Sequence, residues 1–309
     1  MAISSFKSSR VSNGIPKYDS FLANGLNSSI IAEALVIAGG GGGSSGQGGG
    51  GGAGGVVYTD GIVFAKGTTY TVTVGAGGAG GSARGLGSQG QNSNITGGST
   101  SLTAAVGGGR GGNYDTNGTG GDGGSSGGAG GSNAFPRDPG IATTYQGNSG
   151  GCAFDYSAPY IGCGGGGATG TGYSGGDPAS AKGKGGDGTS DFSSWGSATS
   201  TGQNISGTYW FAGGGCGWGE HTGSYVGGGG KGGTNNTTMG ASCSANLGGG
   251  GNGSSYDLPS VAGNGGSGIV IIRYPDSYST FTSTSGSITT TTSGGFRYYV
   301  YTGDGGFTV

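Results

Sequence analysis

Runs of glycine restrict the fold of this chain more than any other feature of its sequence. Of its 309 residues 89 are glycine, which is about four times the usual frequency. The glycines are grouped in runs, for example 39–43, 48–55 and 164–167. Glycine loses more backbone entropy on folding than any other residue, so such runs are often flexible linkers or disordered segments.

Aromatic content argues against disorder. The chain has 16 tyrosines, 10 phenylalanines and 3 tryptophans, whereas disordered segments are usually poor in aromatic and β-branched residues. We therefore expect a folded domain in which the glycine runs have a structural role.

Several protein classes are excluded by composition. Twelve basic residues against fourteen acidic ones give a net charge of −2, so no nucleic acid is expected as a partner. Glycine does not recur at every third residue and proline is scarce, which excludes collagen. No apolar stretch is long enough to span a bilayer, and the first residues lack the apolar core of a signal peptide, so no membrane insertion is expected.

Strand patterns lie at both ends of the chain. They predict strands at 31–37, at 56–64 as a pair about the turn Asp60-Gly61, and at 69–74, 99–106, 268–274, 286–292 and 296–302. Gly303–Gly306 is predicted to turn the chain into a last strand at 307–309. The predicted fold class is all-β, with essentially no α-helix.

The middle of the chain, 107–267, is predicted to form rods of the polyglycine-II type. In the run 120–131 a register of three residues per turn leaves two faces with no side chain larger than alanine. Such rods can pack backbone against backbone, and their N–H groups can bond to neighbouring rods. The alternative is that the runs are flexible linkers. We expect an N-terminal arm at 1–30 and a glycine-rich domain at 31–309, in which 31–106 and 268–309 form a β-sheet platform.

Three phrases resemble the glycine-rich domain of bacteriophage structural proteins, found among tail-fibre and other virion proteins of marine and cyanobacterial phages. They are 34–43 (ALVIAGGGGG), 70–78 (YTVTVGAGG) and 265–274 (GGSGIVIIRY), and the ending 299–309 (YVYTGDGGFTV) is similar to another strand of that family. The order of that strand and 34–43 is permuted here, which implies that they pair in space. The middle is similar in style to tail-fibre adhesins that stack polyglycine-II helices and present variable loops.

Catalysis is not expected. The single histidine, His221, has no neighbours that indicate a catalytic triad. The glycine pattern at 75–80 matches a phosphate-binding loop, but no predicted helix follows it. The four cysteines, at 152, 163, 216 and 243, lack metal-site spacing and are expected to be free or oxidised late. No cofactor and no metal are expected.

Candidate contact residues are aromatic, because tyrosine and tryptophan are enriched at binding hot spots. The candidates for receptor contact are Trp195, Tyr209, Trp210, Trp218, Tyr225, Tyr145 and Tyr156. The last two lie in the loop 133–163, which is rich in aromatic residues and also contains Tyr160. The alternative is that these rings plug the ends of the rods. Under the resemblance, the arm docks on the virion, with Phe6, Lys7, Arg10, Lys17, Tyr18 and Phe21 as candidates.

The resemblance implies a phage virion protein, assembled in the cytoplasm of the bacterial host. We expect a non-enzymatic tail-fibre component or adhesin that presents its loops for host recognition. Its expected partners are other virion proteins and a host cell-surface glycan or outer-membrane protein, and a homo-oligomer is left open. The alternatives are a capsid decoration or head-fibre protein anchored by its arm, and a secreted matrix protein, which the missing signal peptide disfavours.

Overall fold

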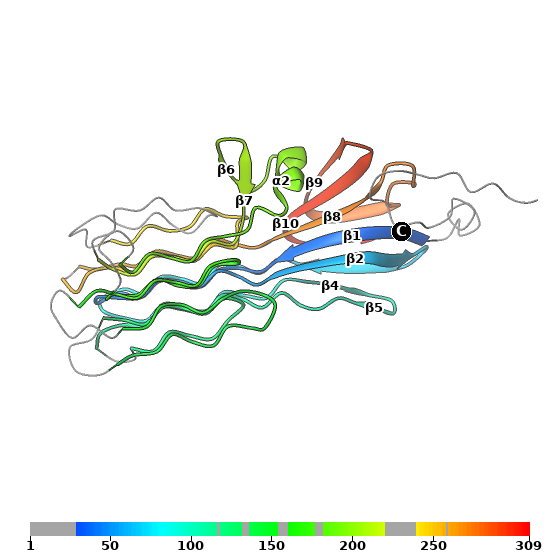
Figure 1. Cartoon of the computed structure of the whole chain (residues 1–309). Helices are drawn as coiled ribbons and strands as arrows, with labels where there is room; N and C mark the ends of the chain where they lie inside the picture. Colours follow the sequence, from blue (N-terminus) through cyan, green and yellow to red (C-terminus); the bar gives the residue numbers. More distant parts are fainter. Residues whose placement is uncertain are drawn as a thin grey trace, which may run out of the picture.

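A barrel-like sheet and a stack of glycine rods lie end to end in the structure, a computed structural model (Figure 1). It describes residues 29–115, 118–131, 136–153, 160–176, 182–219, 239–257 and 259–309. The rods run along the long axis of the molecule, and we call their end away from the barrel the tip.

The barrel is one antiparallel sheet in the strand order β2-β1-β8-β10-β3-β4-β5, with β9 paired to β10 off this path. The strands are β1 Ser29–Ile37, β2 Val56–Ala65, β3 Thr69–Thr73, β4 Asn94–Gly97, β5 Thr100–Ser101, β8 Ile269–Pro275, β9 Ser283–Ser293 and β10 Phe296–Thr308. The barrel is nearly closed, since the Thr100 hydroxyl on β5 donates to the Val63 carbonyl on β2 at 3.3 Å. Both ends of the chain thus contribute to a single sheet.

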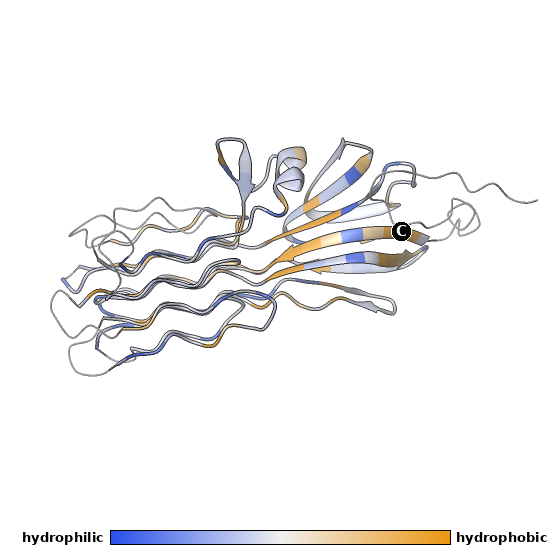
Figure 2. Cartoon of the chain, in the orientation of Figure 1, coloured by the Kyte–Doolittle hydropathy of each residue, from blue (hydrophilic) through white to orange (hydrophobic). Residues whose placement is uncertain are grey.

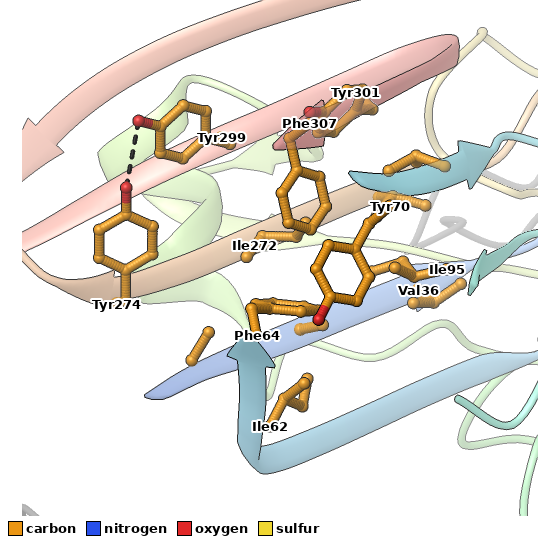
Figure 3. Close-up of a cluster of buried hydrophobic side chains, with 14 of the residues drawn as sticks. Val36, Ile62, Phe64, Tyr70, Ile95, Ile272, Tyr274, Tyr299, Tyr301 and Phe307 are labelled. Atoms are coloured by element: carbon orange, nitrogen blue, oxygen red, sulfur yellow. Dashed lines mark hydrogen bonds between the residues drawn. The ribbon is translucent and has the colours of Figure 1, made fainter. Parts of the chain in front are cut away.

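Alternating side chains fill the barrel. On β1, even-numbered residues such as Val36 point inward, while Leu35 and Ile37 point outward. Inside, Phe307 stacks on Phe281 with ring centroids 4.2 Å apart. The inward cluster also includes the residues shown in Figure 3, where the Tyr274 hydroxyl donates to the Tyr299 hydroxyl at 3.1 Å. Hydrophobic residues are concentrated in the barrel strands, and most residues of the rods are nearly neutral in hydropathy (Figure 2).

Two predicted turns are wrong, because both are irregularities within continuous strands. Asp60 and Gly61 lie opposite Glu33 in the β1–β2 ladder, whose register shifts at this point, and Gly61 has a φ of 62°. In β10 the register with β9 shifts between Tyr301 and Gly305. A glycine in the left-handed region serves a bulge as well as a turn, so the sequence signal does not separate the two.

The shift in β10 also corrects the predicted pairing of 299–309 with 34–43. Residues 296–301 pair with β8, and residues 305–308 pair with β3. Since β8 also pairs with β1, it lies between the two segments that were expected to meet. The bulge thus allows the single strand β10 to pair with β8 along its first half and with β3 along its second half.

The glycine rods are held by hydrogen bonds that repeat every three residues. In rod 38–44, successive N–H groups donate to three neighbouring rods in turn: Gly39 and Gly42 to rod 85–92, Gly40 and Gly43 to rod 261–268, and Gly41 to rod 48–55. Its carbonyls accept in the same cycle from rods 75–81, 106–112 and 248–255. One rod is therefore enclosed by six others, which is the packing expected of three-fold polyglycine-II helices.

Rod 48–55 is enclosed in the same way. Its N–H groups donate to rods 248–255, 106–112 and 162–168, and its carbonyls accept from rods 38–44, 123–131 and 212–218. A Cβ atom built on Gly51 would lie well under 3.0 Å from the Gly41 carbonyl. Glycine is thus required here because neighbouring backbones occupy the space of any side chain.

The run 120–131 keeps the predicted triplet register but is not one straight rod. Gly127 donates to the Gly121 carbonyl and Gly130 to the Gly118 carbonyl, so the run folds back on itself at about residue 124. Beyond this turn, Ser125, Gly128 and Gly131 all donate to the segment 47–53. Rods also form within 38–55 and 75–92, inside the range 31–106 that was assigned to the β-sheet platform.

A small substructure inserted between two rods was not predicted from the sequence. It comprises helix α2 Ser193–Thr199 and the hairpin of β6 Gln203–Ile205 and β7 Thr208–Trp210. Because α2 is the only helix in the part of the chain that the structure describes, the all-β fold class is confirmed. Trp195 on α2 packs on the outer face of the barrel, 4.3 Å from the guanidinium of Arg273. Arg273 also forms a salt bridge with Glu33 at 2.8 Å.

Candidate functional site

The tip collects residues from turns that are far apart in the sequence. Rods 38–44 and 75–81 run from the barrel to the tip, and rods 48–55 and 85–92 return. Where the chain turns from one rod into the next, a few residues at the rod end are not glycine. Five of these residues form a cluster of arginine and tyrosine side chains. We call this the tip cluster: Arg84, Tyr114, Arg137, Tyr160 and Tyr256.

Arg84 joins two of these turns. Its guanidinium carbon lies 3.7 Å from the centre of the Tyr256 ring, and its Nε donates to the Tyr256 carbonyl at 3.1 Å. Residues 83 and 84 both have positive φ, of 49° and 65°. Such a conformation is uncommon for residues other than glycine, and here it carries the chain around the rod end and places the guanidinium against the ring.

Tyr114 is the centre of the cluster. Its ring meets the Tyr256 ring edge-on at 5.5 Å and the Tyr160 ring at 6.0 Å. Arg137 lies over the same ring at 5.7 Å and donates to the carbonyls of Asn113 and Tyr114 at 2.5 and 2.8 Å. The buried Asn113 donates through Nδ2 to the Arg84 carbonyl at 2.6 Å, which ties the two halves together.

All five residues of the cluster are partly exposed. Burial lowers the pKa of Arg137, and the charges of Tyr114 and Asp115 oppose this effect. Neither arginine forms a salt bridge with a carboxylate among the described residues. The cluster therefore offers guanidinium donors beside flat aromatic faces, a combination enriched where proteins make binding contacts.

Of the aromatic residues expected to contact a receptor, only Trp218 is described at the tip. It is partly exposed, and its backbone N–H donates to the Gly48 carbonyl at the end of rod 48–55. Trp195 is buried between α2 and the barrel, and Tyr209 and Trp210 are partly exposed on β7. Tyr145 is 99% exposed but lies at the barrel end of the rods, beside Gln146, whose carbonyl accepts from Val56 on β2.

The remaining predicted residues lie outside the described ranges. These are Tyr156, Tyr225, His221 and the docking candidates Phe6, Lys7, Arg10, Lys17, Tyr18 and Phe21.

Sequence reasoning missed most of the tip cluster. Tyr160 had been noted in a loop rich in aromatic residues, but Arg84, Tyr114, Arg137 and Tyr256 had not been singled out. A usable signal exists for some of them, because Arg84, Tyr114 and Tyr256 each follow a glycine run within a few residues. Which rod ends share the tip depends on the packing order of the rods, and no local pattern gives that order.

Other chemistry is sparse in the described residues. No group of three histidine, cysteine or acidic side chains is placed there to hold a metal ion. None of the four cysteines forms a disulfide. The thiols of Cys163 and Cys216 instead accept backbone N–H groups of Gly175 and Gly185 at 3.4 Å, within the rods. Within the described ranges, no helix has the length and hydropathy needed to cross a bilayer.

Comparison with known proteins gives a family. A search of curated proteins found no match. The model of the glycine-rich domain family matches residues 25–275, which include the rods and the strands from β1 to β8 but not the β9–β10 hairpin. As the match covers most of the chain, this protein belongs to the glycine-rich domain family.

Proposed function

We propose that this protein is a structural component of a bacteriophage virion, namely a tail-fibre component or adhesin whose tip recognises the host surface. The observation that carries the proposal is the tip cluster, in which five arginine and tyrosine side chains from separate rod ends meet at one end of a hydrogen-bonded stack. The assignment to a phage virion is supported by the resemblance of 34–43, 70–78 and 265–274 to phage glycine-rich domains.

The arrangement suits an adhesin for a mechanical reason. The tip cluster is held before any ligand arrives by its own hydrogen bonds, because Arg137 donates to the carbonyls of Asn113 and Tyr114 and Asn113 donates to the Arg84 carbonyl. Preorganisation of this kind improves affinity, because less side-chain and loop entropy is lost on binding. Strand β1 begins at the barrel end opposite the tip, which suits attachment to the virion at that end (Figure 1).

The expected ligand is a cell-surface glycan or an outer-membrane protein. Tyrosine faces pack against apolar sugar faces or side chains, while guanidinium groups donate hydrogen bonds to hydroxyl, carboxylate or phosphate oxygens. No enzymatic step is proposed.

The test compares binding of labelled, purified full-length protein to cells of the host strain. Tyr256→Ala removes the ring that Arg84 covers, and Arg84→Lys keeps the charge but loses the planar stack. We expect Tyr256→Ala to weaken binding about 30-fold, as for a hot spot worth about 2 kcal/mol. Tyr145→Ala is the matched control, since that ring is more exposed but lies away from the tip.

Equal losses for Tyr256→Ala and Tyr145→Ala would refute the tip as the contact surface. Failure of the wild-type protein to bind host cells would refute the adhesin role. Immunogold labelling of virions then separates the alternatives, because label on the capsid surface instead of the tail indicates a decoration or head-fibre protein.

A further inference from the structure

Strand β9 has one open edge. Its only strand partner is β10, and in the part of the chain that the structure describes no backbone hydrogen bond joins residues 283–293 to any other segment. The strand is 11 residues long, and all of its residues are exposed except Ile288 and Thr291, which are partly exposed. It stands at the margin of the barrel (Figure 1).

The hairpin turn fixes which backbone groups point outward. Ser293 and Phe296 are paired across the two-residue turn Gly294-Gly295, whose φ angles are 59° and 81°. Such a turn closes on a hydrogen-bonded pair, and hydrogen-bonded and non-hydrogen-bonded pairs then alternate along the ladder. The N–H and carbonyl groups of Ile288, Thr290 and Thr292 therefore point away from β10.

Pro275 supports this alternation independently. It lies opposite Phe296 in the β8–β10 ladder. Proline has no N–H and cannot donate a ladder hydrogen bond to Phe296. Its presence therefore fits a pair in which the N–H and carbonyl of Phe296 point to β9 and not to β8.

Two devices that usually protect an edge strand, namely charged side chains and proline, are missing from β9. Natural sheets block such edges with lysine, proline, inward-pointing charges or a covering element. The sequence STSGSITTTTS contains no charged residue and no proline. Helix α2 lies on the outer face of the barrel, where Trp195 contacts Arg273 and Tyr298, and it also lies beside β9. It does not extend the β9 ladder, so the backbone groups of that edge keep no strand partner among the described residues.

We propose that the β9 edge pairs with the β9 edge of a second copy of this chain. With a two-fold axis at Thr290, this residue faces its own copy, and Ile288 of each copy faces Thr292 of the other. The three outward N–H groups and three outward carbonyls of each copy are then all satisfied, by six hydrogen bonds. A second copy fits because an uncharged strand meets itself without like-charge repulsion, and threonine pairs are favourable across antiparallel strands.

The consequence is a dimer in which two barrels share one continuous sheet. The tips are remote from this contact, so each copy keeps its tip cluster free. The proposal does not depend on the host-recognition role, and the two can fail separately.

The test measures the molar mass of the full-length protein by sedimentation equilibrium over a range of concentrations. Wild type is expected to form dimers. Thr290→Pro removes the N–H of both central hydrogen bonds but leaves the β10 ladder intact, and it is expected to raise the dimer dissociation constant about 30-fold. Thr290→Lys places like charges opposite each other and is expected to act in the same direction.

Thr71→Lys is the matched control. Thr71 is also an exposed threonine on a strand, but β3 has partners on both sides, β4 and β10. This variant is expected to dimerise like wild type. A wild-type protein that stays monomeric overturns the proposal, and so does a Thr290→Lys variant that dimerises as tightly as wild type.

A cross-link gives a direct readout of register. Facing residues in an antiparallel hydrogen-bonded pair have Cα atoms about 5.5 Å apart, within the range that a disulfide spans. Mild oxidation of Thr290→Cys is expected to give a covalent dimer that wild type, with its four native cysteines, does not give. Equal cross-linking of the two proteins would contradict the proposed register.

Discussion

A single methyl group in the centre of the rods provides the sharpest test of the packing. Gly51 lies where three rods meet: Gly51 donates to the Gly251 carbonyl at 2.8 Å, Gly251 to Gly41 at 2.9 Å, and Gly41 to Gly52 at 2.9 Å. In Gly51→Ala the new Cβ would collide with the Gly41 carbonyl. The rods must separate to admit it, which strains all three hydrogen bonds.

The expected cost is about 2–6 kcal/mol. Overpacking a dense interior costs about 1–3 kcal/mol, and each weakened hydrogen bond adds up to about 0.5–1.5 kcal/mol. The reduced entropy of the unfolded chain returns about 0.4–1 kcal/mol. An unfolding entropy of about 2.1 cal/mol/K per residue gives about 0.65 kcal/mol/K for a chain of this length, so Tm is expected to fall by about 3–9 °C.

Gly303→Ala is the matched control. Gly303 is partly exposed on β10, and the nearest atoms to its added Cβ belong to Ser287 at 3.4 Å, an ordinary contact. Thermal unfolding followed by circular dichroism should leave this variant within about 1–2 °C of wild type, as for a compatible glycine replacement. If Gly51→Ala melts no lower than Gly303→Ala, the rods are not packed backbone against backbone and the reasoning fails.

Two further perturbations probe the barrel. Trp195→Ala removes the ring that packs on Arg273 and lies 6.1 Å from both Tyr58 and Tyr298, and should cost about 3–5 kcal/mol, or a Tm loss of about 5–8 °C. The partly exposed Trp210 gives a control, and an equal loss for Trp210→Ala would contradict the burial argument. Burial, together with a hydrogen bond to Glu33, raises the pKa of Tyr58 to about 12, and burial raises the pKa of Tyr274 and Tyr301. Since the folded pKa of Tyr58 exceeds the unfolded value of about 10, the stability that this group contributes is full below pH 10 and is lost as the pH rises through about 12. The raised pKa values of Tyr274 and Tyr301 act in the same direction. Phenolate absorbance should therefore show tyrosines that ionise only well above pH 10, and titration of every tyrosine near pH 10 in the folded protein would refute the prediction.

The sequence predicted the strands better than their ends. The run 69–74 alternates cleanly and forms β3, and 268–274 forms most of β8, because period-two patterns reflect one buried face. Glycine positions were harder to interpret, since Gly61 and Gly303–Gly306 lie within strands. The β6–β7 hairpin carried a signal that was overlooked, namely Ser206-Gly207 between Ile205 and Thr208, with φ angles of 51° and 88°.

The tip cluster shows where reasoning from sequence ends. Arg84 and Tyr256 are 172 residues apart and meet only because rods 75–81, 85–92, 248–255 and 261–268 are neighbours of rod 38–44. The triplet register tells us that rods can pack, but glycine faces are alike and do not select their neighbours. That selection must come from the residues in the rods that are not glycine and from the barrel strands that lead into them.

Ala53 and Asn252 illustrate how neighbours are selected. Ala53 lies within rod 48–55, yet its methyl group is fully buried against the outer face of the barrel, in the cluster that contains Ile37 and Phe211. Asn252, also fully buried, accepts the Cys216 N–H at 2.8 Å through its side chain. Each such residue fits only at a position where the neighbouring rods leave room for its side chain. A few side chains within the runs can thus determine which rods are neighbours, an order that glycine alone leaves undefined. The turns at the tip are then not needed to determine the packing order of the rods.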